Sequence, residues 1–198
     1  MTDVPKRQDF ETAYAGQAPW DIGRPQQAFL NVADRITGSV LDAGCGTGEN
    51  ALFFASRGHK VTGIDFLEEP IQRARRKASE RGLTATFFVM DALALKDLPE
   101  VFDGVIDSGL FHVFSDEDRK RYVEGLASGL RPGGKLFLLC FSDEEPGTQG
   151  PRRVSKKGGS LRRGRAGVPV CERQAQAQWP QAESLQLRPL VGPGARAR

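Results

Sequence analysis

Short apolar runs alternate with amphipathic stretches through the first 141 residues of the chain. The apolar runs predict five buried strands, at 39–44, 59–65, 85–91, 101–107 and 135–141. Apolar residues at helical spacing predict helices at 49–57, 67–81 and 116–130, after two further amphipathic stretches at 9–14 and 26–36. Glycines and the predicted turn R-P-G-G at 131–134 separate these elements.

Strands that alternate with helices of about 10–15 residues are typical of βαβ units and a parallel sheet. These strands are almost continuously apolar, as expected when helices cover both faces of the sheet. We therefore predict an α/β fold with a Rossmann-like, doubly wound, mostly parallel sheet and helices on both faces. Ligands of such sheets bind beyond the carboxyl ends of the strands.

A glycine-rich loop follows the first predicted strand. In L-D-A-G-C-G-T-G, the glycines Gly44, Gly46 and Gly48 allow a sharp turn and a close approach of the backbone to a ligand. Glu49 stands where a dinucleotide-binding fingerprint has its third glycine. Asp42 precedes the loop, and a carboxylate there favours a ligand with an ammonium group over a pyrophosphate.

Three later strands also end in an acidic residue: Asp65, Asp91 and Asp107. Asp65 is placed to accept hydrogen bonds from ribose hydroxyls. Asp91 can accept from the exocyclic amine of adenine, with Phe66 and Met90 as apolar walls for the ring. A single acid of this kind is more often a helix cap than a ligand contact, but several at one edge of a sheet indicate a binding site.

Several of these segments together resemble the class I S-adenosylmethionine-dependent methyltransferases, from about Trp20 to Phe141. They are V-L-D-A-G-C-G-T-G, G-I-D, M-D-A, F-D-G-V-I-D and L-R-P-G-G-K-L. P-W-D-I-G-R-P-Q and D-S-G-L-F-H-V-F resemble the small-molecule enzymes of that class, such as thiopurine S-methyltransferase-like proteins. The resemblance implies S-adenosyl-L-methionine as cofactor and methyl transfer by direct displacement. The implied acceptor is a small-molecule thiol, phenol or heteroaromatic compound.

The motifs and the resemblance together give a set of candidate site residues. Those expected at the cofactor are Trp20, Asp42, Gly44, Cys45, Gly46, Gly48, Asp65, Phe66, Asp91, Ala92 and Asp107. Those expected at the acceptor are Tyr14, Arg24, Phe111 and His112. His112 is the candidate catalytic residue, with pocket lining as the other interpretation. Arg24 is open between a ligand carboxylate and a surface charge, and Cys45 is interpreted as a small packed residue, not a nucleophile.

Charge divides the chain into two parts. Residues 1–150 carry 17 Lys and Arg against 23 Asp and Glu, a net charge of −6, and residues 151–198 carry 11 against 2, a net charge of +9. We predict a methyltransferase domain over 1–157, with an N-terminal lid at about 1–37. The basic tail at 158–198 is rich in Arg, Gly, Pro and Gln, which predicts disorder or a sequence foreign to the family.

The tail also affects the expected sheet. The C-terminal strands of the family fold are expected to be missing or altered, for instance through a shift of reading frame. The strand at 135–141 would then be an exposed apolar edge, which favours lower stability and aggregation. Nucleic acid is not an expected partner, except through non-specific contact with the basic tail.

Cysteine usage and hydropathy exclude other classes of protein. Cys45, Cys140 and Cys171 are odd in number and far apart, which indicates a reducing cytoplasm and neither a disulfide framework nor a metal cluster. No apolar stretch approaches the roughly 18 residues of a membrane span, and the N-terminus lacks a secretory signal.

Two other functions stay open at this stage. One is a cofactor-binding but catalytically impaired methyltransferase-like protein with an altered C-terminus. The other is a nicotinamide-dependent dehydrogenase, which Glu49 and Asp91 disfavour.

Overall fold

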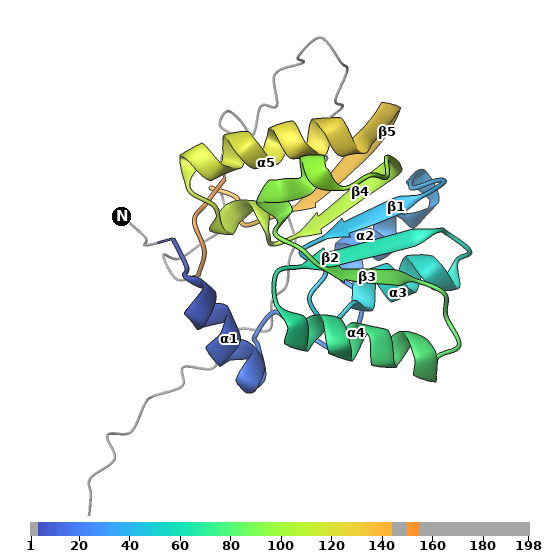
Figure 1. The fold of residues 1–198 in the computed structure, drawn as a ribbon, viewed down its shortest axis with the longest axis horizontal. Helices are drawn as coiled ribbons and strands as arrows, with labels where there is room; N and C mark the ends of the chain where they lie inside the picture. Colours follow the sequence, from blue (N-terminus) through green and yellow to red (C-terminus); the bar gives the residue numbers. More distant parts are fainter. Residues whose placement is uncertain (1–3, 144–149, 155–198) are drawn as a thin grey trace, which may run out of the picture.

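A sheet of five parallel strands forms the centre of the computed structural model, which describes residues 4–143 and 150–154 (Figure 1). The strands are β1 (Val40–Ala43), β2 (Val61–Asp65), β3 (Thr86–Val89), β4 (Phe102–Ser108) and β5 (Leu130–Leu139). Their order is β3-β2-β1-β4-β5, and every neighbouring pair is parallel. The sheet order therefore reverses between β1 and β4, the point at which α/β folds place their ligands.

Helices cover both faces of this sheet, as the apolar strands predict. The helical elements are α1 (Arg7–Ala15), α2 (Gln27–Val32), η1 (Ala33–Arg35), α3 (Glu49–Ser56), α4 (Glu68–Glu80), η2 (Ala92–Asp97), η3 (Phe111–Val113) and α5 (Asp116–Gly129). One apolar core joins the sheet to α2, α3 and α4, where Phe29, Phe54 and Ile71 are buried. A second core joins the other face to η2 and α5 through Leu95 and Tyr122.

The predicted strands and long helices are confirmed, with ends that differ by at most two residues outside β5. The prediction for the stretch at 26–36 needs correction, because this stretch divides into the short helix α2 and the 3-10 turn η1. Leu30 in that stretch is exposed, although its spacing suggested a buried face. The short elements η2 and η3 were not predicted, since three to six residues carry too little periodicity.

The predicted turn at 131–134 also needs correction, because it lies inside β5. The pairing of β4 with β5 jumps from Phe102–Leu130 to Gly104–Lys135, so four residues bulge opposite Asp103. Gly133 has a φ of +83°, which supplies the turn within the strand. The pattern thus identified the bend, and the strand continues on both sides of it.

The edges of the described sheet differ in exposure. β3 leaves Phe88 and Val89 exposed. On β5, the side chains at 136–139 are buried, and one parallel bridge follows, between Ser142 and Val154. The predicted tail at 158–198, with its altered strands, lies outside the described residues. The domain boundary at 157 and the aggregation of a bare β5 edge stay predictions.

Within the part of the chain that the structure describes, no helix is long and apolar enough to cross a membrane.

The helix α1 lies beyond the arrowheads of the strands, at the carboxyl edge of the sheet (Figure 1). This position makes it a cover for the edge at which the predicted site residues gather.

Candidate active site

The loop between β1 and α3 is a bend that only glycines can form. Gly44, Gly46 and Gly48 all have positive φ, of +72°, +52° and +85°. A Cβ at position 46 would stand 2.6 Å from the hydroxyl oxygen of Tyr14, and one at position 48 would stand 2.8 Å from the Cβ of Ala74. The glycines therefore provide the conformation of the bend and leave room for the side chains of Tyr14 and Ala74 to pack against it.

Cys45 fixes this bend to the neighbouring strand. Its backbone N–H donates to the carbonyl of Ile64 on β2 over 2.8 Å. The thiol is buried, and burial raises its pKa well above the ordinary value, as do the nearby carboxylates Asp42 and Asp65. A thiol of this kind is not a nucleophile at neutral pH, in agreement with the interpretation of Cys45 as a packed residue.

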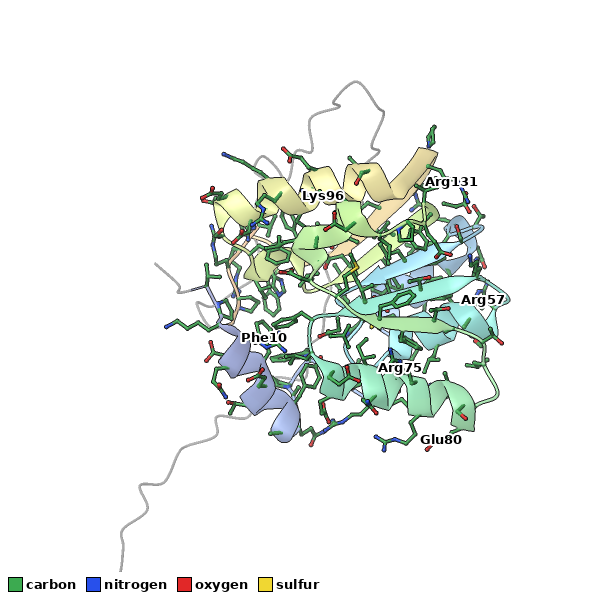
Figure 2. The ribbon with its side chains drawn as sticks, in the orientation of Figure 1. Phe10, Arg57, Arg75, Glu80, Lys96 and Arg131 are labelled. Carbon is green, nitrogen blue, oxygen red and sulfur yellow. The ribbon has the colours of Figure 1, made fainter. Side chains whose placement is uncertain are left out.

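Aromatic side chains from the N-terminal segment close over the bend. Trp20 donates its indole N–H to the hydroxyl of Tyr14 over 3.0 Å. Phe10 packs edge-on against Trp20 and Phe66, with ring centroids 5.7 and 5.5 Å apart. Figure 2 shows Phe10 extending from α1 toward the body of the domain. The segment predicted as a lid is thus packed against the predicted cofactor residues.

Polar contacts tie the same lid to the loop and to α4. Thr47 donates its hydroxyl to Asp21 over 3.0 Å, and Arg73 of α4 donates to the backbone carbonyl of Tyr14 over 2.9 Å. Lys77, one turn further along α4, donates to the hydroxyl of Thr47 over 2.8 Å. The lid, the bend and α4 therefore form one connected unit.

Glu49 anchors the first turn of α3 to α4. Its carboxylate forms a two-pronged ion pair with Arg81, both contacts at 2.9 Å, and a third ion pair with Lys77 at 2.8 Å. Burial tends to raise the pKa of Glu49, but Arg81 and Lys77 bring it below the ordinary value. From sequence, Glu49 was only a departure from a dinucleotide fingerprint. The spacing of four residues between Lys77, in the last turn of α4, and Arg81, directly after it, was the available signal.

Asp65, at the end of β2, supports the bend directly. One carboxylate oxygen accepts the backbone N–H of Gly46 over 3.1 Å, and the other accepts that of Leu67 over 3.0 Å. Burial raises the pKa of Asp65 to about 6. Because a carboxylate has about four acceptor positions, Asp65 can accept further bonds from a ligand.

Asp42 is the unusual group of the site. It lies within β1 and is fully buried, and among the described residues neither carboxylate oxygen has a hydrogen-bond partner. Burial, then the charges of Asp107 and Asp65, raise the pKa of Asp42 to about 8, although the backbone N–H of Ala51, which lies near it without the geometry of a hydrogen bond, acts in the opposite direction. A buried acceptor without a partner destabilises a fold. The position therefore fits a ligand that brings a donor, above all a cationic one.

Asp107, predicted as a cofactor contact, has its oxygens engaged by the protein. It accepts the N–H groups of Leu110 and Phe111 over 2.8 and 3.1 Å and the hydroxyl of Tyr122 over 2.9 Å. Burial raises the pKa of Asp107 to about 7. These bonds hold the loop after β4, which carries Phe111 and His112.

The remaining predicted residues are more peripheral. Asp91 is exposed and caps η2 by accepting the N–H of Leu93 over 2.9 Å, while Ala92 beside it is buried. Arg24 is exposed and makes no ion pair within the described ranges. Nor do the described residues contain a group of three or more His, Cys, Asp and Glu side chains that could hold a metal ion.

His112 lies at the other end of the site, on η3. Its ring is buried, and its Nδ1 accepts the backbone N–H of Phe141 over 3.3 Å. Burial, with Arg119 and Arg153 nearby, lowers the pKa of His112 to about 4, so the ring is neutral near pH 7. Phe111 is buried beside it, under the guanidinium of Arg119 at 5.0 Å.

Known proteins resemble this chain in sequence and in fold. Residues 40–134 match the family model described as a methyltransferase domain. The chain is 38% identical over 160 residues to 2-heptyl-1-hydroxyquinolin-4(1H)-one methyltransferase of Mycobacteroides abscessus, which covers 74% of this chain and 70% of that relative. The chain belongs to the S-adenosylmethionine-dependent methyltransferases.

Two further relatives of this methyltransferase carry sulfur chemistry in their descriptions. Probable thiol methyltransferase 2 of Arabidopsis thaliana is 30% identical, over 71% of this chain and 64% of that one. A solved structure reported for the conversion of a disulfide bond into a thioacetal group during echinomycin biosynthesis is 44% identical, with a TM-score of 0.66. That match covers 70% of this chain and 63% of the other, so the chain spans less than two thirds of the solved protein.

The fold class, the family and the cofactor predicted from sequence are thereby confirmed. The residues present fit S-adenosylmethionine, because Asp42, two residues before the bend, offers an unmatched acceptor for an ammonium group. The individual contacts with the cofactor stay predictions, and two substitutions test them.

The first prediction concerns the bend. Gly46→Ala places a Cβ against the Tyr14 hydroxyl and adds the strain of a positive φ, about 1–2 kcal/mol. We expect the affinity for S-adenosylhomocysteine, measured by calorimetry, to fall at least about tenfold. Gly58→Ala is the matched control, because Gly58 also has positive φ but nothing within 4 Å of its Cβ position. Equal affinities in the two variants would contradict the assignment.

The second prediction concerns Asp42. A carboxyl with a raised pKa in the folded state disfavours its charged form, so it lowers stability progressively as the pH rises from about 4 to about 8. Between pH 4 and pH 8, the free energy of unfolding should therefore fall less in Asp42→Asn than in the wild type. The difference should be at least about 1.4 kcal/mol, the equivalent of one pKa unit. The substitution should also weaken S-adenosylhomocysteine binding.

The measurement is denaturant unfolding at pH 4 and pH 8 without cofactor. Asp97→Asn, an exposed acid on η2, is the control and should keep the wild-type pH dependence. If Asp42→Asn keeps it as well, Asp42 is not the buried acid described here.

Proposed function

We propose that this chain transfers a methyl group from S-adenosylmethionine to a small-molecule thiol, phenol or heteroaromatic acceptor. The observation that carries the proposal is the unpartnered carboxyl group of Asp42, buried beside a glycine bend that Tyr14 of the aromatic lid contacts. The relatives named above support the acceptor classes, since one is named for a hydroxyquinolinone and another for thiols.

In this proposal, the residues around the bend hold the cofactor. Asp42 accepts from its amino group and Asp65 from its ribose hydroxyls. Asp91, Ala92 and Phe66 flank its adenine. When bound, S-adenosylmethionine supplies a methyl group on a cationic sulfonium centre.

The lid has two tasks in this reaction. Tyr14 and Trp20, held to each other by a hydrogen bond, exclude water that would otherwise solvate charge at the reacting centre. Their aromatic faces also attract a cation, by about 0.5–2 kcal/mol each. Because the lid is bound to the bend through Thr47 and Asp21, closure and cofactor binding are linked.

Positioning provides the rest of the rate acceleration. Holding two reactants in line can supply about 7–11 kcal/mol of the barrier. The loop after β4 presents Phe111 and His112 to an acceptor, and the bonds from Asp107 to Leu110, Phe111 and Tyr122 keep that loop in place.

The test is a methyl-transfer assay with S-adenosylmethionine labelled in its methyl group. The panel contains small aromatic thiols, phenols and hydroxylated quinolones, and calorimetry measures binding of S-adenosylhomocysteine and of NADH. We expect S-adenosylhomocysteine but not NADH to bind, and labelled methyl to appear on at least one acceptor class. Asp97→Asn is the control and should keep the wild-type rate.

Two results would contradict the proposal. Binding of S-adenosylhomocysteine without transfer to any member of the panel would favour the catalytically impaired alternative. Binding of NADH in its place would favour the dehydrogenase.

A further inference from the structure

The hydrogen bond at Nδ1 of His112 determines which ring nitrogen carries the proton. The donor in that bond is the backbone N–H of Phe141, so Nδ1 must present its lone pair. Since the ring is neutral near pH 7, its single proton is on Nε2. His112 is therefore a hydrogen-bond donor at Nε2 and has no lone pair there with which to accept a proton.

Gly109 leaves room beside this donor at the carboxyl edge of the sheet. Among the described residues, Nε2 makes no hydrogen bond. It faces Gly109, where a Cβ would stand 3.4 Å from both Cε1 and Nε2. Gly109 has a φ of +86° and donates its N–H to the carbonyl of Leu139 over 2.9 Å, which fixes it between the ends of β4 and β5. A larger residue at this position would crowd the donor.

Positive charge approaches His112 from two other elements. Arg119 of α5 donates to the backbone carbonyls of Phe111 and His112 over 3.1 and 3.3 Å. Arg153, beyond β5, lies over the ring of Phe141 at 4.9 Å, and that ring packs edge-on against the imidazole at 5.7 Å. The charges of Arg119 and Arg153 therefore both act on the imidazole.

Two acidic groups near the loop after β4 are already engaged by other residues. Asp116 pairs with Arg152 at 2.6 Å and more distantly with Arg119, at 3.6 Å. Asp107 accepts from Tyr122 and from two backbone amides. The thiol of Cys140 also lies close by and interacts with Arg119. The positive charges of Arg119 and Arg153 therefore favour an anion at the imidazole.

We propose that the acceptor is methylated as an oxygen or sulfur anion that accepts a hydrogen bond from Nε2–H of His112, and that His112 does not remove its proton. This inference rests on the proposed function and narrows its acceptor to an ionised thiol, phenol or hydroxylated heteroaromatic compound. A neutral amine is disfavoured by the same geometry, because its methylated product is a cation and Nε2 has no lone pair with which to take its proton.

The reaction balances without a protein base. The acceptor loses its proton to solvent before it reacts. A lone pair on its oxygen or sulfur forms the new bond to the methyl carbon, and the electron pair of the breaking carbon–sulfur bond stays on the former sulfonium sulfur. An anion and a cation thus become two neutral groups, and their attraction is stronger in a site that excludes water.

Binding tests the proposal without turnover. The absorbance of 4-nitrophenol reports its ionisation, so we would titrate it against pH in the complex of the protein with S-adenosylhomocysteine. We expect bound nitrophenol to ionise at a lower pH than free nitrophenol. An unchanged or raised midpoint would overturn the proposal, whatever the outcome of the transfer assay.

Kinetics provide the second arm, with thiophenols and phenols of graded acidity and anilines of similar size. We expect the pH midpoint of kcat/KM to follow the acidity of each acceptor, and anilines to react slowly at every pH. One midpoint common to all acceptors, or anilines as fast as thiophenols, would overturn the proposal. If no acceptor is methylated but the nitrophenol midpoint is lowered, the proposed function is contradicted and the anion site still stands.

Substitutions at His112, with His59 as control, distinguish a hydrogen-bond donor from a general base. His112→Leu should lower kcat/KM for ionised acceptors about 10- to 100-fold and raise the nitrophenol midpoint, without moving the acceptor-dependent pH midpoint of kcat/KM. His112→Gln, which keeps an N–H donor, should recover part of the loss. His59→Leu is the control, because His59 bonds only the carbonyl of Gly38 at the far end of β1. A pH midpoint of kcat/KM that moves in His112→Leu would show that His112 is a base and would overturn the proposal. The affinity for S-adenosylhomocysteine verifies folding of the variants.

Discussion

The hydroxyl of Tyr14 occupies the space that any side chain at position 46 would need. This contact depends on a glycine with positive φ, and it brings the N-terminal helix to the carboxyl edge of the sheet. Three hydrogen bonds then keep the lid in place. Trp20 donates to the hydroxyl of Tyr14, Thr47 donates to Asp21, and Arg73 donates to the backbone carbonyl of Tyr14. Without the glycine bend, the aromatic cover would have no surface to close on.

The two ends of the site have opposite electrostatic character. Over β1 and β2, burial raises the pKa values of Asp42 and Asp65, and the charge of Arg7 offsets only part of this effect at Asp65. Beyond β4 and β5, the charges of Arg119 and Arg153 act on a neutral His112. The first environment suits a ligand with an ammonium and a sulfonium group, and the second suits an anionic acceptor. The site is therefore polarised along the direction of the methyl transfer that we propose.

The sequence predicted the framework well because the signals for it are local. The apolar runs that form β1, β2 and β4 are short and bounded by glycines or acids, and each acid marks the carboxyl end of a strand. The bend was visible for the same reason, since its three glycines are within five residues. The turn at 131–134 was located but misjudged, because only the partner strand shows that β5 continues beyond it.

The missing information was in contacts between distant residues. Glu49 depends on Arg81, which is 32 residues away, and the tautomer of His112 depends on Phe141, which is 29 residues away. Asp107 looked like the other strand-end acids, yet Tyr122 and the loop amides engage its oxygens. Nothing in a local pattern distinguishes such an acid from one that is left open, as Asp42 is.

The central claim is that the glycine bend and the N-terminal lid form a single cofactor-binding unit. Hydrogen exchange of the backbone amides, with and without S-adenosylhomocysteine, tests it most directly. The account predicts that amides at 44–48 and in α1 become protected together, at the same ligand concentration. Protection of the bend with unchanged exchange in α1, or protection confined to other elements, would contradict it.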